Sequence, residues 1–187
     1  MTSLTITSAT DGNHGKSVAW GAQLFECNAV IYIHEHVSDA RENAIKEYGA
    51  HVIRIKGNYE ASLAACKADA DKNGWQIISD TSWDGYEDIP LQVMAGYSLI
   101  GHELISQMDE LPTHAFLPIG VGGLAAGIVA PLWQAMGTDL CQIISVESNL
   151  SACFQDSIAA GVPQVVNISS ETLPRVWCAA NHQFTFI

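Results

Sequence analysis

The chain has 187 residues, of which 48% are hydrophobic and only 15% are charged, proportions typical of a folded globular protein and not of a disordered one. Its 8 lysine and arginine residues against 20 aspartate and glutamate residues give a formal net charge of −12. This negative charge argues against nucleic acid as a partner and against a polybasic patch that binds membranes.

Short runs rich in β-branched residues alternate along the chain with segments in which apolar residues recur three and four positions apart. This alternation is typical of βαβ units with a mainly parallel sheet and right-handed crossovers, so the sequence predicts an α/β fold. Strands are expected at residues 4–7, 29–33, 51–55, 76–79, 115–119 and 142–146. Helices are expected around residues 18–25, 40–48, 61–68 and 91–105.

The first predicted strand is followed by Thr-Asp-Gly-Asn-His-Gly at residues 10–15, directly before a helix. Its two glycines allow positive φ angles and a close approach of a ligand to the backbone. The helix start offers unpaired N–H groups and a partial positive charge, which suit a carboxylate or a phosphate. Asp11, Asn13 and His14 add an acid or base and two hydrogen-bonding groups. The segment is therefore either an anion site or an ordinary helix cap.

The five cysteines are widely spaced and form no C-x-x-C pair, so they are expected to be reduced and mostly buried in a cytoplasmic protein. The first residues contain no basic segment followed by an apolar one, so no secretory signal is expected. His34 and His36 lack the spacing of a zinc motif, and no metal site is expected.

Residues 80–90 interrupt the alternation with a long loop that contains two aromatic side chains. The loop marks a boundary between two expected domains, residues 1–80 and 85–187, and loops of this kind are often functional. Asp80 ends a predicted strand, and α/β sheets bind ligands at the carboxyl ends of their strands. Next to Trp83, it is a candidate general base. The alternative is a plain turn with a solvated carboxylate.

A third loop, Gly-Val-Gly-Gly-Leu-Ala at residues 120–125, lies between a predicted strand and a predicted buried helix. The uncharged stretch 115–133 has the length of a membrane span, but its glycines and prolines favour strand, loop and helix instead. Glycines at a helix start form a nest of N–H donors for a phosphate. The loop also fits G-x-G-x-x-A, and Glu147 lies where a ribose-binding acid would. A phosphate site, a dinucleotide site and a tight turn all remain open.

Together the three loops resemble, in order and spacing, those of the 2,3-diaminopropionate ammonia-lyases, pyridoxal-phosphate enzymes of fold type II, the tryptophan-synthase-β group. The similarity runs from about residue 4 to about residue 167. It implies a three-layer α/β fold with mainly parallel sheets, truncated at both ends. Residues 1–80 would form a small lobe with the asparagine loop. Residues 85–187 would form part of a large lobe that binds the cofactor phosphate, ending in an atypical tail.

The resemblance also implies a role for each position. Asp11 and Asp80 resemble the two carboxylates that remove the α-proton, one from the D-isomer and one from the L-isomer of diaminopropionate, in a reaction that yields pyruvate and ammonia. The implied cofactor-binding residues are Asn13, Gly120, Val121, Gly122, Gly123 and Leu124. The residues implied to hold the substrate carboxylate are Thr10, Gly12, His14 and Gly15.

One departure concerns the lysine that binds the cofactor as a Schiff base, which in the family lies upstream of the asparagine loop. The lysines of this chain all lie downstream: Lys16, Lys46, Lys56, Lys67 and Lys72. Pyridoxal phosphate is therefore expected to bind without covalent attachment, in a catalytically incomplete lyase whose ligand is an amino acid or a phosphate.

Three other functions remain open. One is a working ammonia-lyase that is completed by a partner chain or by an unconventional lysine. Another is a non-catalytic, truncated fold that binds a small molecule or a phosphate, or that self-associates. The third is a nucleotide-dependent oxidoreductase. Because truncated sheets expose unpaired backbone, a homodimer or a higher homo-oligomer is expected.

Overall fold

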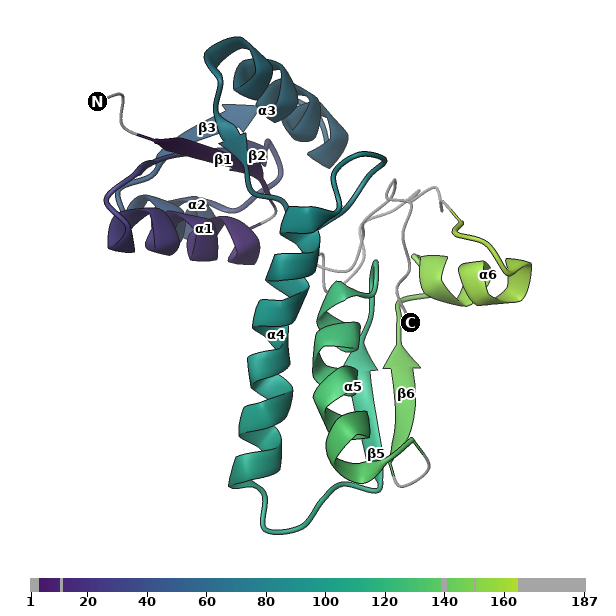
Figure 1. Cartoon of the computed structure of the whole chain (residues 1–187). Helices are drawn as coiled ribbons and strands as arrows, with labels where there is room; N and C mark the ends of the chain where they lie inside the picture. Colours follow the sequence, from purple (N-terminus) through teal and green to yellow (C-terminus); the bar gives the residue numbers. More distant parts are fainter. Residues whose placement is uncertain (1–3, 11, 139–140, 150, 165–187) are drawn as a thin grey trace. The chain divides into compact units, whose positions relative to one another are not determined.

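The computed structural model describes residues 4–10, 12–138, 141–149 and 151–164 (Figure 1). The described residues up to Ser79 form one compact unit, and those from Asp80 onwards form a second. Each unit contains parallel strands connected by helices, so the predicted α/β class is confirmed. The predictions for Asp11 and for the tail beyond residue 164 lie outside the described residues.

The first unit contains a parallel sheet with the strand order β3-β2-β1-β4. Its strands are β1 (Thr5–Ala9), β2 (Asn28–His34), β3 (His51–Ile55) and β4 (Gln76–Ile77). Its helices are α1 (Asn13–Leu24), α2 (Asp39–Lys46) and α3 (Tyr59–Asn73). The chain adds β2 and β3 on one side of β1, and α3 then leads back to β4 on the other side. The carboxyl ends of β1 and β4 therefore lie on either side of the topological switch point, where α/β sheets bind ligands.

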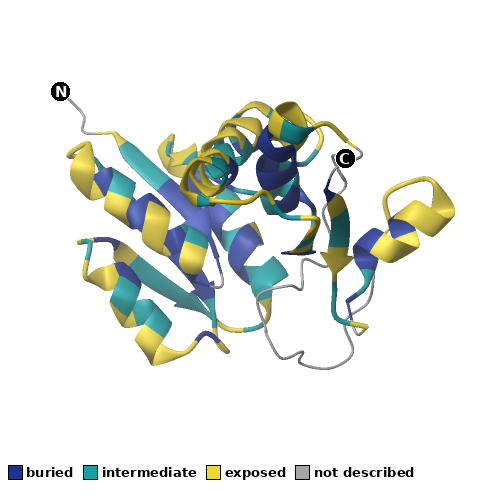
Figure 2. Ribbon diagram, turned by 90° about the horizontal axis from the view of Figure 1, so that it is seen from below, coloured by how far each residue is buried: buried dark blue, intermediate teal, exposed yellow. Residues whose placement is uncertain are grey.

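Strand β2 is covered on both faces, and its alternate side chains enter two different cores. Ala29, Ile31 and Ile33 pack with α1 and α2 on one face. Val30 and Tyr32 pack with α3 on the other face. Helices on both sides of the sheet explain why this strand is a continuous apolar run instead of an alternating one. The helices themselves alternate between buried and exposed residues (Figure 2).

The second unit has a two-stranded parallel sheet of β5 (His114–Pro118) and β6 (Gln142–Val146). Helix α5 (Gly123–Met136) connects the strands, and its Ile128 and Leu132 pack with Leu117 in a shared core. Helix α4 (Asp88–Gln107) runs alongside α5, and α6 (Cys153–Ala160) follows β6 (Figure 1).

All six predicted strands are found, two with the predicted bounds and four with shifts of one or two residues at their ends. Strand β4 is shorter than expected, because only Gln76 and Ile77 pair with β1. The uncharged stretch 115–133 forms β5, the glycine loop and most of α5, as predicted. Within the ranges that the structure describes, no helix is both long and apolar enough to cross a membrane.

Helices α4 and α5 approach each other through Gly127, and this contact allows a stability prediction. A Cβ at Gly127 would lie 2.8 Å from the carbonyl oxygen of Met94 and 2.7 Å from Cβ of Tyr97. Gly127→Ala is therefore expected to lower the free energy of unfolding by about 1–3 kcal/mol, because the helices must separate. Gly96→Ala is the matched control, since a Cβ there meets nothing within 4 Å; it should stabilise α4 by up to about 1 kcal/mol. Urea unfolding followed by circular dichroism measures both changes, and equal effects would contradict the packing argument.

Candidate functional site

The loop after β1 is held by its own side chains and hydrogen bonds. The hydroxyl of Thr10 accepts hydrogen bonds from the N–H groups of Gly12 and Gly15, at 3.0 and 3.1 Å. A Cβ at Gly15 would lie only 2.3 Å from Cγ2 of Thr10 and 3.0 Å from Cγ2 of Ile31. Glycine at position 15 thus lets α1 approach the sheet, and buried Thr10 gives the loop its shape.

At the start of α1, Asn13 is exposed and the N-cap residue Gly12 has no side chain to cap the helix, although the Thr10 hydroxyl accepts the N–H of Gly15 in the first turn. Gly12 is the N-cap residue, with φ 144°, a backbone conformation that favours glycine. The first bond of the helix runs from the N–H of Lys16 to the carbonyl of Gly12, at 2.9 Å. The N–H of Asn13 therefore has no acceptor within the helix. An exposed Asn13 side chain at this helix start fits the predicted anion or cofactor contact.

His14 connects this loop to the end of β4. Its Nε2 lies 3.0 Å from the carbonyl oxygen of Ile78. The N–H of Ile78 in turn donates to the carbonyl oxygen of Thr7 in β1, at 2.8 Å. The structure thus brings the asparagine loop and the end of β4 together at the switch point of the sheet.

The loop after Asp80 contains a tight turn. The N–H of Tyr86 donates to the carbonyl of Trp83 at 2.8 Å, and the two aromatic rings stack with centroids 4.1 Å apart. Gly85, inside the turn, has φ 79°. Half-buried Asp80 lies before the turn. Burial, and secondly the negative charge of Asp80, raise the pKa of Tyr97 on α4 to about 12. The carboxylate is therefore within electrostatic reach of this phenol.

The glycine loop ends at an uncapped helix start in the second unit. Gly122, the N-cap residue of α5, has φ 97° and no side chain to cap the helix. The first bond of the helix joins the N–H of Ala126 to the carbonyl of Gly122, at 2.9 Å. The N–H groups of residues 123–125 therefore lack acceptors within the helix. A Cβ at Gly123 would meet nothing within 4 Å. Open space beside unpaired donors fits a phosphate.

Helix α6 contacts the glycine loop through Cys153. The carboxylate of Glu147 accepts hydrogen bonds from the N–H groups of Phe154 and Gln155, both at 2.9 Å. The thiol of Cys153 donates to the carbonyl of Gly120 at 3.5 Å. Burial, and secondly the negative charge of Glu147, raise the pKa of this thiol. Glu147 thus caps α6, and neither this helix nor the Cys153 contact was predicted from the sequence.

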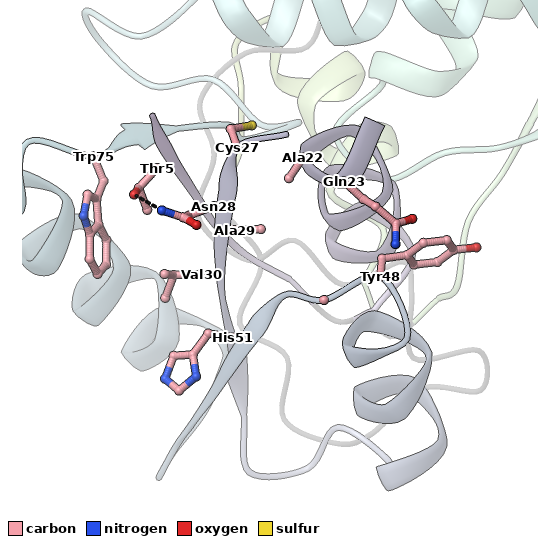
Figure 3. Close-up of a pocket in the computed structure, with 11 residues that line it drawn as sticks. Thr5, Ala22, Gln23, Cys27, Asn28, Ala29, Val30, Tyr48, His51 and Trp75 are labelled. Carbon is pink, nitrogen blue, oxygen red and sulfur yellow. Dashed lines mark hydrogen bonds between the residues drawn. The ribbon is translucent and has the colours of Figure 1, made fainter. Parts of the chain in front are cut away.

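Figure 3 shows a cavity of the first unit whose lining includes no residue of these loops. It has a volume of about 440 Å³ and is lined by Thr5, Asn28, His51 and Trp75, which lie at or just before the amino ends of the strands. None of the predicted site residues lines it. In the described part of the chain, no three His, Cys, Asp or Glu side chains are grouped so that they could hold a metal ion.

The three loops and the parallel sheets have counterparts in known proteins. A family model for pyridoxal-phosphate-dependent enzymes matches residues 2–184. The chain belongs to this family. The resemblance drawn from the three loops is therefore confirmed, as is pyridoxal phosphate as the cofactor of the family. The same result argues against a dinucleotide site in the glycine loop.

Among curated members of the family, diaminopropionate ammonia-lyase of Escherichia coli K12 is 35% identical over 171 residues. This alignment covers 90% of the present chain and 42% of the lyase, so the chain spans about two fifths of that relative's length. The biosynthetic L-threonine dehydratase of Salmonella typhimurium is 28% identical over 158 residues, which cover 84% of this chain and 29% of the dehydratase.

Solved structures of the family share the fold. The holo form of diaminopropionate ammonia-lyase from Escherichia coli matches with a TM-score of 0.87 and 33% identity, over 95% of this chain and 45% of that one. Threonine deaminase from Solanum lycopersicum matches with a TM-score of 0.80 over 97% of this chain and 50% of that one, at 23% identity, and supports the fold alone. The predicted fold-type-II architecture is confirmed.

Proposed function

We propose that this chain binds pyridoxal phosphate and contributes the acid–base residues of an ammonia-lyase reaction in which 2,3-diaminopropionate and water give pyruvate and two molecules of ammonia. The uncapped start of α5 beside open space at Gly123 is the observation that carries the proposal. The 35% identity to diaminopropionate ammonia-lyase supports the choice of substrate.

The cofactor would be held at two places. Backbone groups of residues 120–124 would hold its phosphate, because the start of α5 offers N–H donors and a partial positive charge. Asn13 would hold its ring hydroxyl. Accordingly, residues 1–80 would be a small lobe that carries the asparagine loop, and residues 85–187 part of a larger lobe that binds the phosphate. When bound, pyridoxal phosphate withdraws electrons from the α-carbon of the substrate, so a carboxylate of modest basicity suffices as the base.

Two carboxylates would remove the α-proton. Asp80 would act on the L-isomer and Asp11 on the D-isomer, so that both enantiomers are substrates. The position of Asp80, three residues beyond the end of β4 at the switch point, supports its assignment. The residues that would form the site for the substrate carboxylate at the start of α1 are Thr10, Gly12, His14 and Gly15. The buried Thr10 hydroxyl would contribute indirectly, by holding the loop in shape through its hydrogen bonds to Gly12 and Gly15.

The attachment of the cofactor would not be covalent. The ammonium of Lys16 lies 5.9 Å from the ring centroid of Tyr48, and that of Lys46 pairs with Glu42 at 2.6 Å. The remaining lysines lie after β3 or on α3: Lys56, Lys67 and Lys72. None belongs to the three loops, so no amine of these residues would release the product, and turnover by the chain alone would be slow.

The protein would work as a homo-oligomer in the cytoplasm. Large apolar side chains are exposed in the second unit, among them Phe116 at 66% and Leu99 at 63%. Contact with a second copy would remove such side chains from water. The four described cysteines are free thiols, which fits a reducing compartment.

A titration of the purified chain with pyridoxal phosphate tests this proposal. Saturable binding that inorganic phosphate displaces is expected, and borohydride reduction should leave no labelled lysine in the mass spectrum. Pyruvate formed from diaminopropionate, measured with lactate dehydrogenase, should appear slowly. Absence of saturable binding would overturn the cofactor site. A single labelled lysine would overturn the non-covalent attachment and identify the missing amine.

A further inference from the structure

The hydrogen bond between His14 and Ile78 lies where β4 stops pairing with β1. Strand β4 has only two residues and is an edge strand of the described sheet. Beyond it, the N–H of Ile78 donates to Thr7 at 2.8 Å, and the carbonyl of Ile78 lies 3.0 Å from Nε2 of His14. Both backbone polar groups of Ile78 are therefore held, one by the sheet and one by a side chain of the asparagine loop.

The protonation of His14 at Nε2 follows from its partner. A carbonyl oxygen only accepts hydrogen bonds, so Nε2 must carry a hydrogen. Both the neutral imidazole with hydrogen on Nε2 and the imidazolium satisfy this requirement.

The position of Ile78 in the sequence gives this bond a functional consequence. Asp80 follows two residues later, and two extended residues span at most about 7 Å. The direction in which the chain leaves Ile78 thus limits where the Asp80 carboxylate can lie. General-base catalysis is sensitive to displacements of this carboxylate of about 1 Å, which can lower a rate about 100-fold.

We propose that His14 is a positioning residue that acts through the Ile78 carbonyl on the segment leading to Asp80. The expected effect on catalysis rests on the proposed function. The anchor, by which we mean the hydrogen bond from His14 to the carbonyl of Ile78, does not. The imidazole of His14 would hold the backbone at Ile78, while backbone N–H groups at the start of α1 would hold the substrate. Loss of the imidazole should therefore impair the L-isomer reaction of Asp80 more than the D-isomer reaction.

Amide hydrogen exchange of the full chain tests the anchor without any activity. In His14→Ala, exchange at Ile78 and Ser79 should become at least about 10-fold faster, because local opening is no longer opposed by the lost hydrogen bond. His14→Gln should restore slow exchange, since its amide N–H can reach the same carbonyl. His51→Ala, at the amino end of β3, is the matched control and should leave Ile78 unchanged. Unchanged exchange in His14→Ala would overturn the proposal.

Exchange of the substrate α-proton tests the consequence. With pyridoxal phosphate in D₂O, His14→Ala should slow deuterium uptake by L-2,3-diaminopropionate about 10–100-fold and change uptake by the D-isomer less than about 3-fold, with His14→Gln close to the parent. Equal losses for both isomers, together with weaker substrate binding, would overturn the positioning role in favour of a direct substrate contact. If the parent chain exchanges neither isomer, the proposed function fails, and the amide exchange at Ile78 still decides on the anchor.

Discussion

Replacing Asp80 with asparagine is expected to slow the loss of the α-proton from L-2,3-diaminopropionate by at least about 100-fold, the usual contribution of a general base. Asparagine keeps the size and hydrogen-bonding capacity of the side chain but cannot accept the proton. Because the D-isomer reaction is assigned to Asp11, it should change little. Deuterium uptake at the α-carbon, followed by NMR in the presence of pyridoxal phosphate, measures both isomers in one experiment.

The control for this experiment lies in the same loop. Asp84 is exposed and sits inside the turn closed by Trp83 and Tyr86. Asp84→Asn removes an equal charge nearby, so its rates should match those of the parent. If Asp80→Asn leaves the L-isomer rate unchanged, Asp80 is not the base in this reaction. If Asp84→Asn lowers the rate as much as Asp80→Asn does, the effect comes from the change in net charge.

A second large effect is expected from Gly123→Asp. A Cβ at this position meets nothing within 4 Å, so there is open space where the side chain begins. A carboxylate in the first turn of α5 interacts favourably with the helix dipole, and the free energy of unfolding should stay the same or rise by up to about 1 kcal/mol. The same carboxylate would lie beside the proposed phosphate, and repulsion between two close anions should raise the dissociation constant of pyridoxal phosphate at least about 100-fold.

The neutral variant Gly123→Asn separates charge from size. It has nearly the same shape as the aspartate variant and should retain most of the affinity if repulsion is the cause. Fluorescence titration gives the dissociation constants, and thermal unfolding verifies that both variants fold. Unchanged cofactor affinity in Gly123→Asp would rule out the start of α5 as the phosphate site.

The strands were predictable because most of them are short runs rich in β-branched or other apolar residues. In β2, for example, both faces are covered and the run is unbroken. The asparagine and glycine loops were also recognisable, since each combines glycines with a strand before it and a helix after it. In such cases the local sequence is enough to predict the element or the loop.

The interactions that support the loops were not predictable. Glu147 caps α6 from seven and eight residues away, and Cys153 contacts the carbonyl of Gly120, 33 residues earlier. His14 reaches Ile78 across 64 residues. None of these side chains has a local pattern that reveals its partner. For Cys153 and His14 it is the order of the strands that brings the two segments together.

The packing of the asparagine loop divides its positions into two kinds. At Gly15 even a methyl group collides with Thr10, and the Thr10 hydroxyl accepts two hydrogen bonds from the loop itself. Asn13 instead projects from the helix start into solvent. A change at position 13 can therefore replace the chemical group that the loop presents while its shape stays constant. The loop can acquire a new ligand preference through one exposed residue, without any redesign of the scaffold beneath it.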